Sequence, residues 1–155
     1  MGLDVYISKR IFIGAMYKSC GITGEIHLFK HGREIPVVLE NVSSIIEQVY
    51  HGRKTWWLLE WLNRELLGGL TGDCEEHEIS SEELIRLHRA CTEVLRHRDK
   101  PDFNAVCKAY LGCQPKEDID EESLEFFLQD IQELKEALEG AVMDEDVSFT
   151  VSASW

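Results

Sequence analysis

The chain has 155 residues, a net charge of −13 and 44% hydrophobic residues. This length fits one domain and the apolar content is sufficient for a buried core, which excludes a disordered chain. The negative charge argues against direct binding to nucleic acid or to anionic membranes, and no apolar run is long enough to span a bilayer.

The first third of the sequence predicts strands. Residues 3–13 alternate between apolar and polar side chains, as expected for a strand with one buried face. Residues 24–40 predict a hairpin, because two β-rich runs flank a short turn in which Gly32 can supply a positive φ. Residues 42–50 predict a further strand that runs up to a break at His51-Gly52.

Residues 53–67 predict a helix rich in tryptophan. Trp57 and Trp61 are four residues apart and therefore lie on one face, and apolar residues cover more than half of the circumference. Such a helix is either largely buried or exposes an aromatic patch, and burial is the more common case. Gly68-Gly69 is predicted to end it.

The middle of the chain predicts a second helix over residues 81–98. Ser80 followed by Glu83 forms a capping box at its start. Residues 99–119 contain prolines and a glycine, so they predict an irregular connection that holds a short helix at 102–110.

The last third predicts the most regular helix, over residues 121–139, with Asp120 as the N-cap and Gly140 at its end. Residues 147–155 alternate strictly and predict a final strand with one buried face. We therefore expect residues 1–155 to form a single α+β domain. Its mostly antiparallel sheet would contain the N-terminal strand, the hairpin and the C-terminal strand, packed with three main helices.

The negative charge is concentrated at one end of the chain. Residues 1–66 carry a net charge of +1 and residues 67–100 carry −3, whereas residues 101–155 carry −11. Many of these carboxylates fall on the polar side of the last helix. They either keep the protein in solution or form a docking surface for a basic partner. The candidate partner-binding residues are Asp118, Asp120, Glu125, Glu133, Glu136 and Glu139.

No local motif for catalysis, a cofactor or a phosphate loop is present in the sequence. Cys74, His77, His88 and Cys91 have the number and spacing of zinc ligands. The apolar stripe of helix 81–98 already explains Cys91, however, and a reduced cysteine on a core face is ordinary. We therefore predict no metal and no cofactor.

The five cysteines are odd in number and scattered, and Asp4 and Lys9 interrupt the apolar start. These features predict reduced thiols, no signal peptide and a cytoplasmic protein. Whether the chain forms a homo-oligomer stays open.

The start of the Trp-rich helix is the second candidate site. Basic and aromatic residues lie together there, and they could either stack a nucleotide or begin a packed helix. A pocket for a small ligand, or an active site, would be built from Arg53, Lys54, Trp57, Asp73 and Cys74.

Four segments, in order, resemble an uncharacterised family of small proteins encoded by phages and prophages. They are MGLDVYI at the start, EQVYHGRKTWWLLEWL, GDCEEHEISSEEL and the terminal SASW, and they cover about half of the chain. The matching positions are Arg53, Lys54, Trp61, Asp73, Cys74, Glu76 and Ser80. The family tends to have Asn and His where this chain has Trp56 and Leu59, so an activity that needs those polar residues would be lost here.

The resemblance implies a phage accessory protein that acts in the cytoplasm of a bacterial host. We therefore expect a binding protein rather than an enzyme. Its partner would be a host protein, and a defence nuclease with a basic groove for nucleic acid is one such target, which the acidic helix would enter as a nucleic-acid mimic. The alternatives are a ligand-binding protein or enzyme with the pocket at Arg53 and Lys54, and an interaction domain stabilised by zinc.

Overall fold

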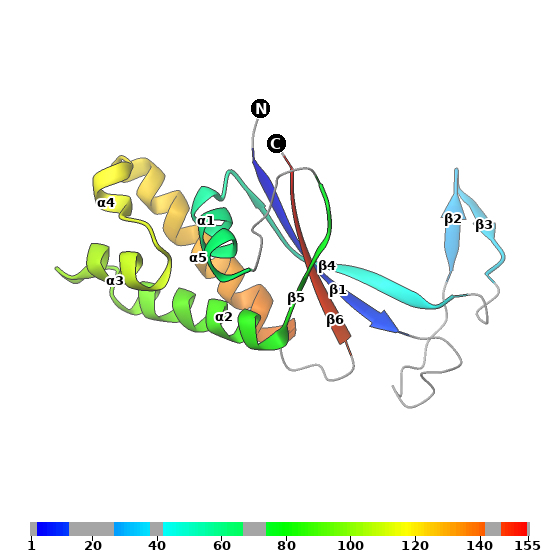
Figure 1. Cartoon of the computed structure of the whole chain (residues 1–155). Helices are drawn as coiled ribbons and strands as arrows, with labels where there is room; N and C mark the ends of the chain where they lie inside the picture. The colour runs from blue at the N-terminus through cyan, green and yellow to red at the C-terminus, as the bar shows by residue number, and fades with distance from the viewer. Residues whose placement is uncertain (1–2, 13–26, 38–41, 67–73, 142–146, 155) are drawn as a thin grey trace.

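The computed structural model of the protein describes residues 3–12, 27–37, 42–66, 74–141 and 147–154 (Figure 1). In chain order the elements are β1 (Asp4–Phe12), β2 (Leu28–Lys30), β3 (Arg33–Ile35), β4 (Ser44–Arg53), α1 (Trp56–Glu65), β5 (His77–Ile79), α2 (Ser81–Arg96), α3 (Phe103–Tyr110), α4 (Pro115–Asp118), α5 (Glu121–Ala141) and β6 (Val147–Ser154). Helices combined with an antiparallel sheet confirm the predicted α+β class.

Four strands form the main sheet, in the order β4-β1-β6-β5, and every neighbouring pair is antiparallel. The strands at the two ends of the chain, β1 and β6, are therefore central neighbours, as Figure 1 shows. The alternation seen in the sequence decides which side of each strand is covered. Val5 and Ile7 of β1 and Phe149 and Val151 of β6 are buried.

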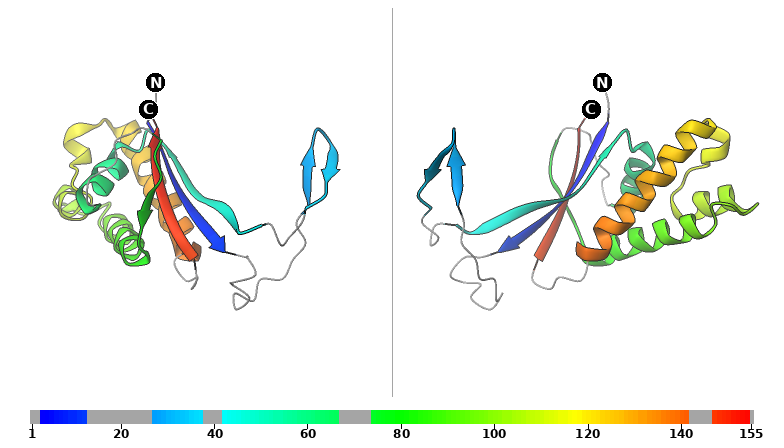
Figure 2. Two further views of the ribbon diagram at one scale, coloured as in Figure 1. Left: turned by 45° about the vertical axis from the view of Figure 1, so that its right-hand side comes forward. Right: turned by 180° about the vertical axis from the view of Figure 1, so that it is seen from behind.

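The five helices of the described residues all lie on one side of the main sheet (Figure 2). The long helix α5 packs against α2 and against strand β4. Of the two cases left open for the Trp-rich helix α1, the structure shows burial, with Trp57 1% and Trp61 2% exposed. These side chains join those of the sheet and of α2, α3 and α5 in one hydrophobic core.

The hairpin β2–β3 forms a separate two-stranded sheet, and Figures 1 and 2 show it standing away from the helices. Its turn has a positive φ at both His31 and Gly32, which is the geometry of a type I′ turn. The prediction that this hairpin belongs to the main sheet is wrong, because β4 and β5 take that place. Leu28 and Phe29 are consecutive, so they point to opposite sides and the hairpin has no single apolar face to bury.

Several element boundaries differ from the sequence-based ones. Strand β4 continues through His51-Gly52 to Arg53, so α1 begins at Trp56 rather than at residue 53. Helix α5 passes through Gly140 and ends at Ala141. The strand β5 has only three residues, which is too short for an alternating pattern to be recognised.

The predicted helix starts are confirmed where side-chain caps mark them. The Ser80 hydroxyl accepts a hydrogen bond from the backbone N–H of Glu83, and the Glu83 carboxylate accepts one from the backbone N–H of Ser80. At α5, the Asp120 carboxylate accepts a hydrogen bond from the N–H of Ser123, 2.8 Å away. The short helix predicted at 102–110 is α3.

Candidate functional site

Helix α5 has one side in the core and one side in solvent. The solvent side carries six exposed carboxylates, which we call the acidic face: Glu121, Glu122, Glu125, Glu133, Glu136 and Glu139. With a rise of about 1.5 Å per residue they extend over roughly 27 Å of helix. Because the opposite side of α5 is fixed in the core, these charges are held on a rigid element.

The acidic face has few cations to balance it. Among the described residues its one ion pair joins Glu139 to Lys135, at 3.2 Å and within the same helix. Two further carboxylates accept hydrogen bonds from glutamines one turn before them: Glu133 from Gln129 at 2.8 Å and Glu136 from Gln132 at 2.6 Å. These bonds order the side chains and leave their negative charge uncompensated.

Two of the predicted partner-binding acids lie just before α5. Asp120 is exposed, and its hydrogen bond with the N–H of Ser123 lowers the pKa of its carboxyl group, so that it is ionised as the N-cap. Asp118 lies in α4, and its side chain is outside the described part of the chain. The remaining four, Glu125, Glu133, Glu136 and Glu139, belong to the acidic face.

A cleft of about 580 Å³ lies between the start of α1 and the first half of α5, and three of the five predicted ligand residues line it. Its lining residues are Arg53, Lys54, Trp56, Trp57, Ile119, Ser123, Phe126, Phe127 and Asp130. The volume is in the range of small-molecule sites. The sequence alone gave no sign that the second wall comes from α5, because residues more than sixty positions apart meet there.

Aromatic rings build the floor and one wall of this cleft. Trp56 stacks on Phe127 with ring centroids 6.4 Å apart, and Trp57 meets the same phenylalanine edge-on at 5.8 Å. Phe127 is 4% exposed, whereas its neighbour Phe126 is 60% exposed and stands at the rim.

A half-buried carboxyl group, Asp130, is part of the same cleft. Burial, followed by repulsion from Glu133, raises the pKa of Asp130 to about 6. Burial also raises the pKa of the nearby Tyr50, with Asp130 and Glu133 as smaller causes. A carboxyl with a perturbed pKa in a cleft is a feature of functional sites, although packing alone can also produce it.

The other two predicted ligand residues are not part of this cleft as described. Asp73 lies outside the described residues. Cys74 is exposed beside the main sheet, where its N–H donates to the carbonyl of Ala153 at 3.1 Å, and it is not among the residues that line the cleft. The sequence placed Cys74 close to Asp73, but strand β6 and not α1 is its neighbour.

The zinc hypothesis gains no support from the arrangement. Within the described ranges no group of three or more His, Cys, Asp or Glu side chains is placed to hold a metal ion. Cys91 is fully buried in the core and Cys74 is exposed. Burial raises the pKa of Cys91 to about 12, which disfavours the thiolate that zinc binds.

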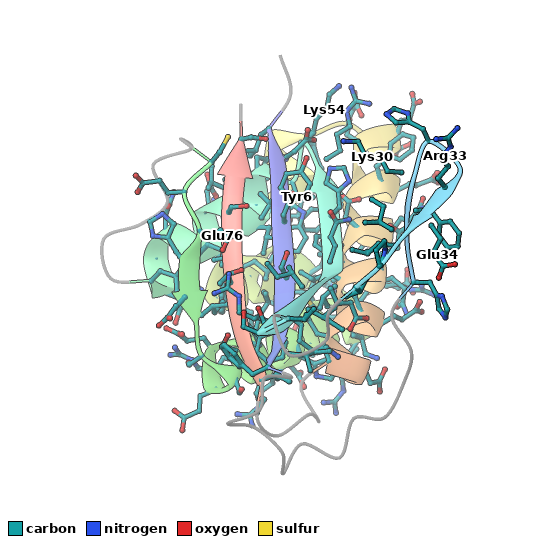
Figure 3. The ribbon with its side chains drawn as sticks, turned by 90° about the vertical axis from the view of Figure 1, so that its right-hand side faces the viewer. Tyr6, Lys30, Arg33, Glu34, Lys54 and Glu76 are labelled. Carbon is teal, nitrogen blue, oxygen red and sulfur yellow. The ribbon has the colours of Figure 1, made fainter. Side chains whose placement is uncertain are left out.

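The face of the main sheet without helices is polar. Figure 3 views it directly, with Tyr6 at its centre and Glu76 beside it. Tyr6 stacks on His51 at 4.5 Å, and Arg10 forms an ion pair with Glu76 at 3.5 Å. Alternation in β1 and β6 could have identified this face, but only the strand order shows which residues share it.

Comparisons of the chain with protein-family models, with curated proteins and with solved structures found no significant match. No helix in the described part of the chain has the length and apolar character needed to cross a membrane.

Proposed function

We propose that this protein is a binding protein whose main recognition element is the acidic face of α5. The partner is a protein with a basic surface, of the kind that binds nucleic acid. The observation that carries the proposal is a row of exposed carboxylates on a helix anchored in the core, with one ion pair among them in the described residues.

Three features support a docking role beyond solubility. The six carboxylates of the acidic face occupy one helix, while the exposed cations Lys30 and Arg33 belong to the hairpin, which stands away from the helices (Figure 1). The exposed ring of Phe126 lies next to the acidic face, and an aromatic anchor with charged neighbours is typical of protein interfaces. Glutamine hydrogen bonds also hold two of the carboxylates, which lowers the entropy lost on binding.

The resemblance to phage and prophage proteins suggests where the partner is found. A phage accessory protein acts on proteins of its host, and several host defence proteins have basic grooves for nucleic acid. We therefore propose a host protein as the partner, with the acidic face in place of the nucleic-acid backbone.

The test is an affinity capture from a bacterial host lysate, followed by binding measurements with the purified partner. The acidic face is changed by reversing four charges, in Glu125→Lys, Glu133→Lys, Glu136→Lys and Glu139→Lys. We expect at least a tenfold loss of affinity, and an affinity of the unchanged protein that falls as salt rises from 50 to 300 mM, because salt screens exposed charges. Duplex DNA should compete with the unchanged protein for binding to the captured partner.

A control variant with the same change in net charge separates this surface from overall charge. It reverses four exposed carboxylates outside α5: Glu60, Glu75, Glu78 and Glu82. The control should keep the affinity of the unchanged protein. If both variants capture the same proteins with the same affinity as the unchanged protein, α5 is not the recognition element.

A further inference from the structure

The cleft between α1 and α5 has the features of a separate ligand site. Its cationic end is formed by Arg53 and Lys54, both exposed. Neither forms an ion pair in the described part of the chain, although the protein has many more carboxylates than cations. In a chain of net charge −13, two neighbouring exposed cations with no ion pair among the described residues form a place where an anion is attracted.

The first turn of α1 faces the same end of the cleft. No acidic residue lies in this turn, and the side chain of its N-cap, Thr55, makes no capping hydrogen bond. The N-terminus of a helix carries a partial positive charge that favours a nearby anion. The backbone N–H groups of Trp56 and Leu58 already donate to the carbonyls of Lys54 and Thr55, so this start of α1 contributes mainly through the helix dipole. The uncapped start of α1 and the two cations, Arg53 and Lys54, therefore both favour a bound anion at this end of the cleft.

The backbone at Lys54 shows that this corner is held in an unusual conformation. Lys54 has a φ of 59°, a left-handed value that non-glycine residues rarely adopt. Its N–H donates to the carbonyl of Leu3, which fixes the turn between β4 and α1. This conformation keeps Arg53, Lys54 and Trp56 around one opening.

One buried polar atom of the cleft lining has no hydrogen-bond partner among the described residues. The indole N–H of Trp57, which lines the cleft and is 1% exposed, has no hydrogen-bond partner in the described residues. The buried hydroxyl groups of Tyr50 and Thr55, which also have no partner among the described residues, lie beside Gly52 and do not line the cleft. Buried polar groups are nearly always paired in folded proteins, so the Trp57 indole N–H in the cleft lining is free to donate to a ligand.

The remaining walls fit a planar ring. Trp56 and Phe126 provide apolar faces, and Ser123 and Asp130 provide groups that accept hydrogen bonds from a ring N–H. We propose that the cleft binds a small ligand in which a planar ring is joined to a phosphate or a carboxylate. The anion lies at Arg53, Lys54 and the start of α1, and the ring lies against Trp56 and Phe126.

Two matched pairs of probes test this with the full chain. Adenosine 5′-monophosphate is compared with adenosine, and indole-3-acetate with tryptophol, so that each pair differs in its anion. Amide shifts in a two-dimensional NMR titration locate the site at residues 53–57 and 119–130. We expect at least one anionic probe to bind there at least tenfold more tightly than its neutral partner, and the pair that shows the difference identifies the anion.

Variants then assign the two halves of the ligand. Arg53→Gln with Lys54→Gln should remove the advantage of the anionic probe, and Phe126→Ala should weaken both members of the pair at least fivefold. The control is Arg89→Gln with Lys108→Gln, two exposed cations that do not line this cleft, and it should change neither affinity. Thermal melting confirms that each variant is folded.

The proposal is overturned if neither anionic probe shifts these amides at millimolar concentration. It is also overturned if the anionic and neutral probes bind equally well, or if the cleft variants behave as the control does. Because these probes do not involve the protein partner, the acidic-face proposal stands or fails separately.

Discussion

The two sides of α5 differ in nearly every property except their backbone. The inner side contributes Phe127, Ile131, Leu134 and Leu138 to the core, each almost completely buried. The outer side carries the acidic face, whose members are all exposed. One amphipathic helix therefore contributes to the core and also holds the acidic face in place, since burial of one side fixes the position of the other. Substitutions on the inner side should therefore change stability, and substitutions on the outer side should change recognition.

The neighbouring residues Phe127 and Phe126 test this comparison most strongly. Phe127→Ala should lower the free energy of unfolding by about 3–5 kcal/mol, because it removes a buried ring that contacts Trp56 and Trp57. Phe126→Ala, the matched control, should cost less than about 1 kcal/mol, because that ring is mostly exposed. Urea denaturation measures both, and equal losses would show that α5 does not have an inner and an outer side.

Gly52 tests the part of the core that lies at the end of β4. A Cβ atom at this position would lie 2.6 Å from the Thr55 Cγ2 atom and 2.7 Å from the Tyr50 hydroxyl oxygen. Gly52→Ala should therefore lower the free energy of unfolding by about 1–3 kcal/mol through overpacking. Gly140→Ala is the control, since a Cβ there meets nothing within 4 Å. A melting temperature unchanged by Gly52→Ala would contradict this packing.

Asp130 lies at the boundary between the two sides of α5, and its effect on the free energy of unfolding depends on pH. Its pKa is raised to about 6 by burial and by Glu133, so the folded state holds its proton more tightly than the unfolded state does. The raised pKa stabilises the folded state below about pH 4, and this stabilisation is lost as the pH rises through about 6. Asp130→Asn should be more stable than the unchanged protein at pH 7 by about 1 kcal/mol, after allowing for solvent screening of a half-exposed group.

The measurement for Asp130 is the difference in unfolding free energy between the two proteins from pH 4 to pH 8. It should be near zero at pH 4 and grow up to about pH 7. A difference that stays constant over this range would mean that the carboxyl group does not titrate with a raised pKa.

The outer side should give the smallest effect on stability. Glu136→Gln keeps an oxygen that can accept the hydrogen bond from Gln132, and it should change the free energy of unfolding by less than about 0.5 kcal/mol. Thermal melting measures this change. A loss above 1 kcal/mol would place Glu136 among the packing residues and would weaken the division of α5 into two sides.

Much of the fold could be predicted because its signals are local. The alternation in β1 and β6, the capping box at Ser80 and the apolar spacing of α5 each lie within one segment, and the structure confirms them. Strand β5 and the separate position of the hairpin could not be predicted. Both depend on which strands pair, and pairing is a long-range property.

By itself the sequence determined where the carboxylates lie on the last helix and that the opposite side of this helix is apolar. It also placed Arg53 and Lys54 beside two tryptophans. Only the tertiary structure decided that Trp56 and Trp57 meet Phe126, Phe127 and Asp130 in one cleft, and that Cys74 lies elsewhere. The physical reason is that periodicity fixes which side of an element is apolar, whereas the packing of α5 against α2 and β4 fixes what that side meets.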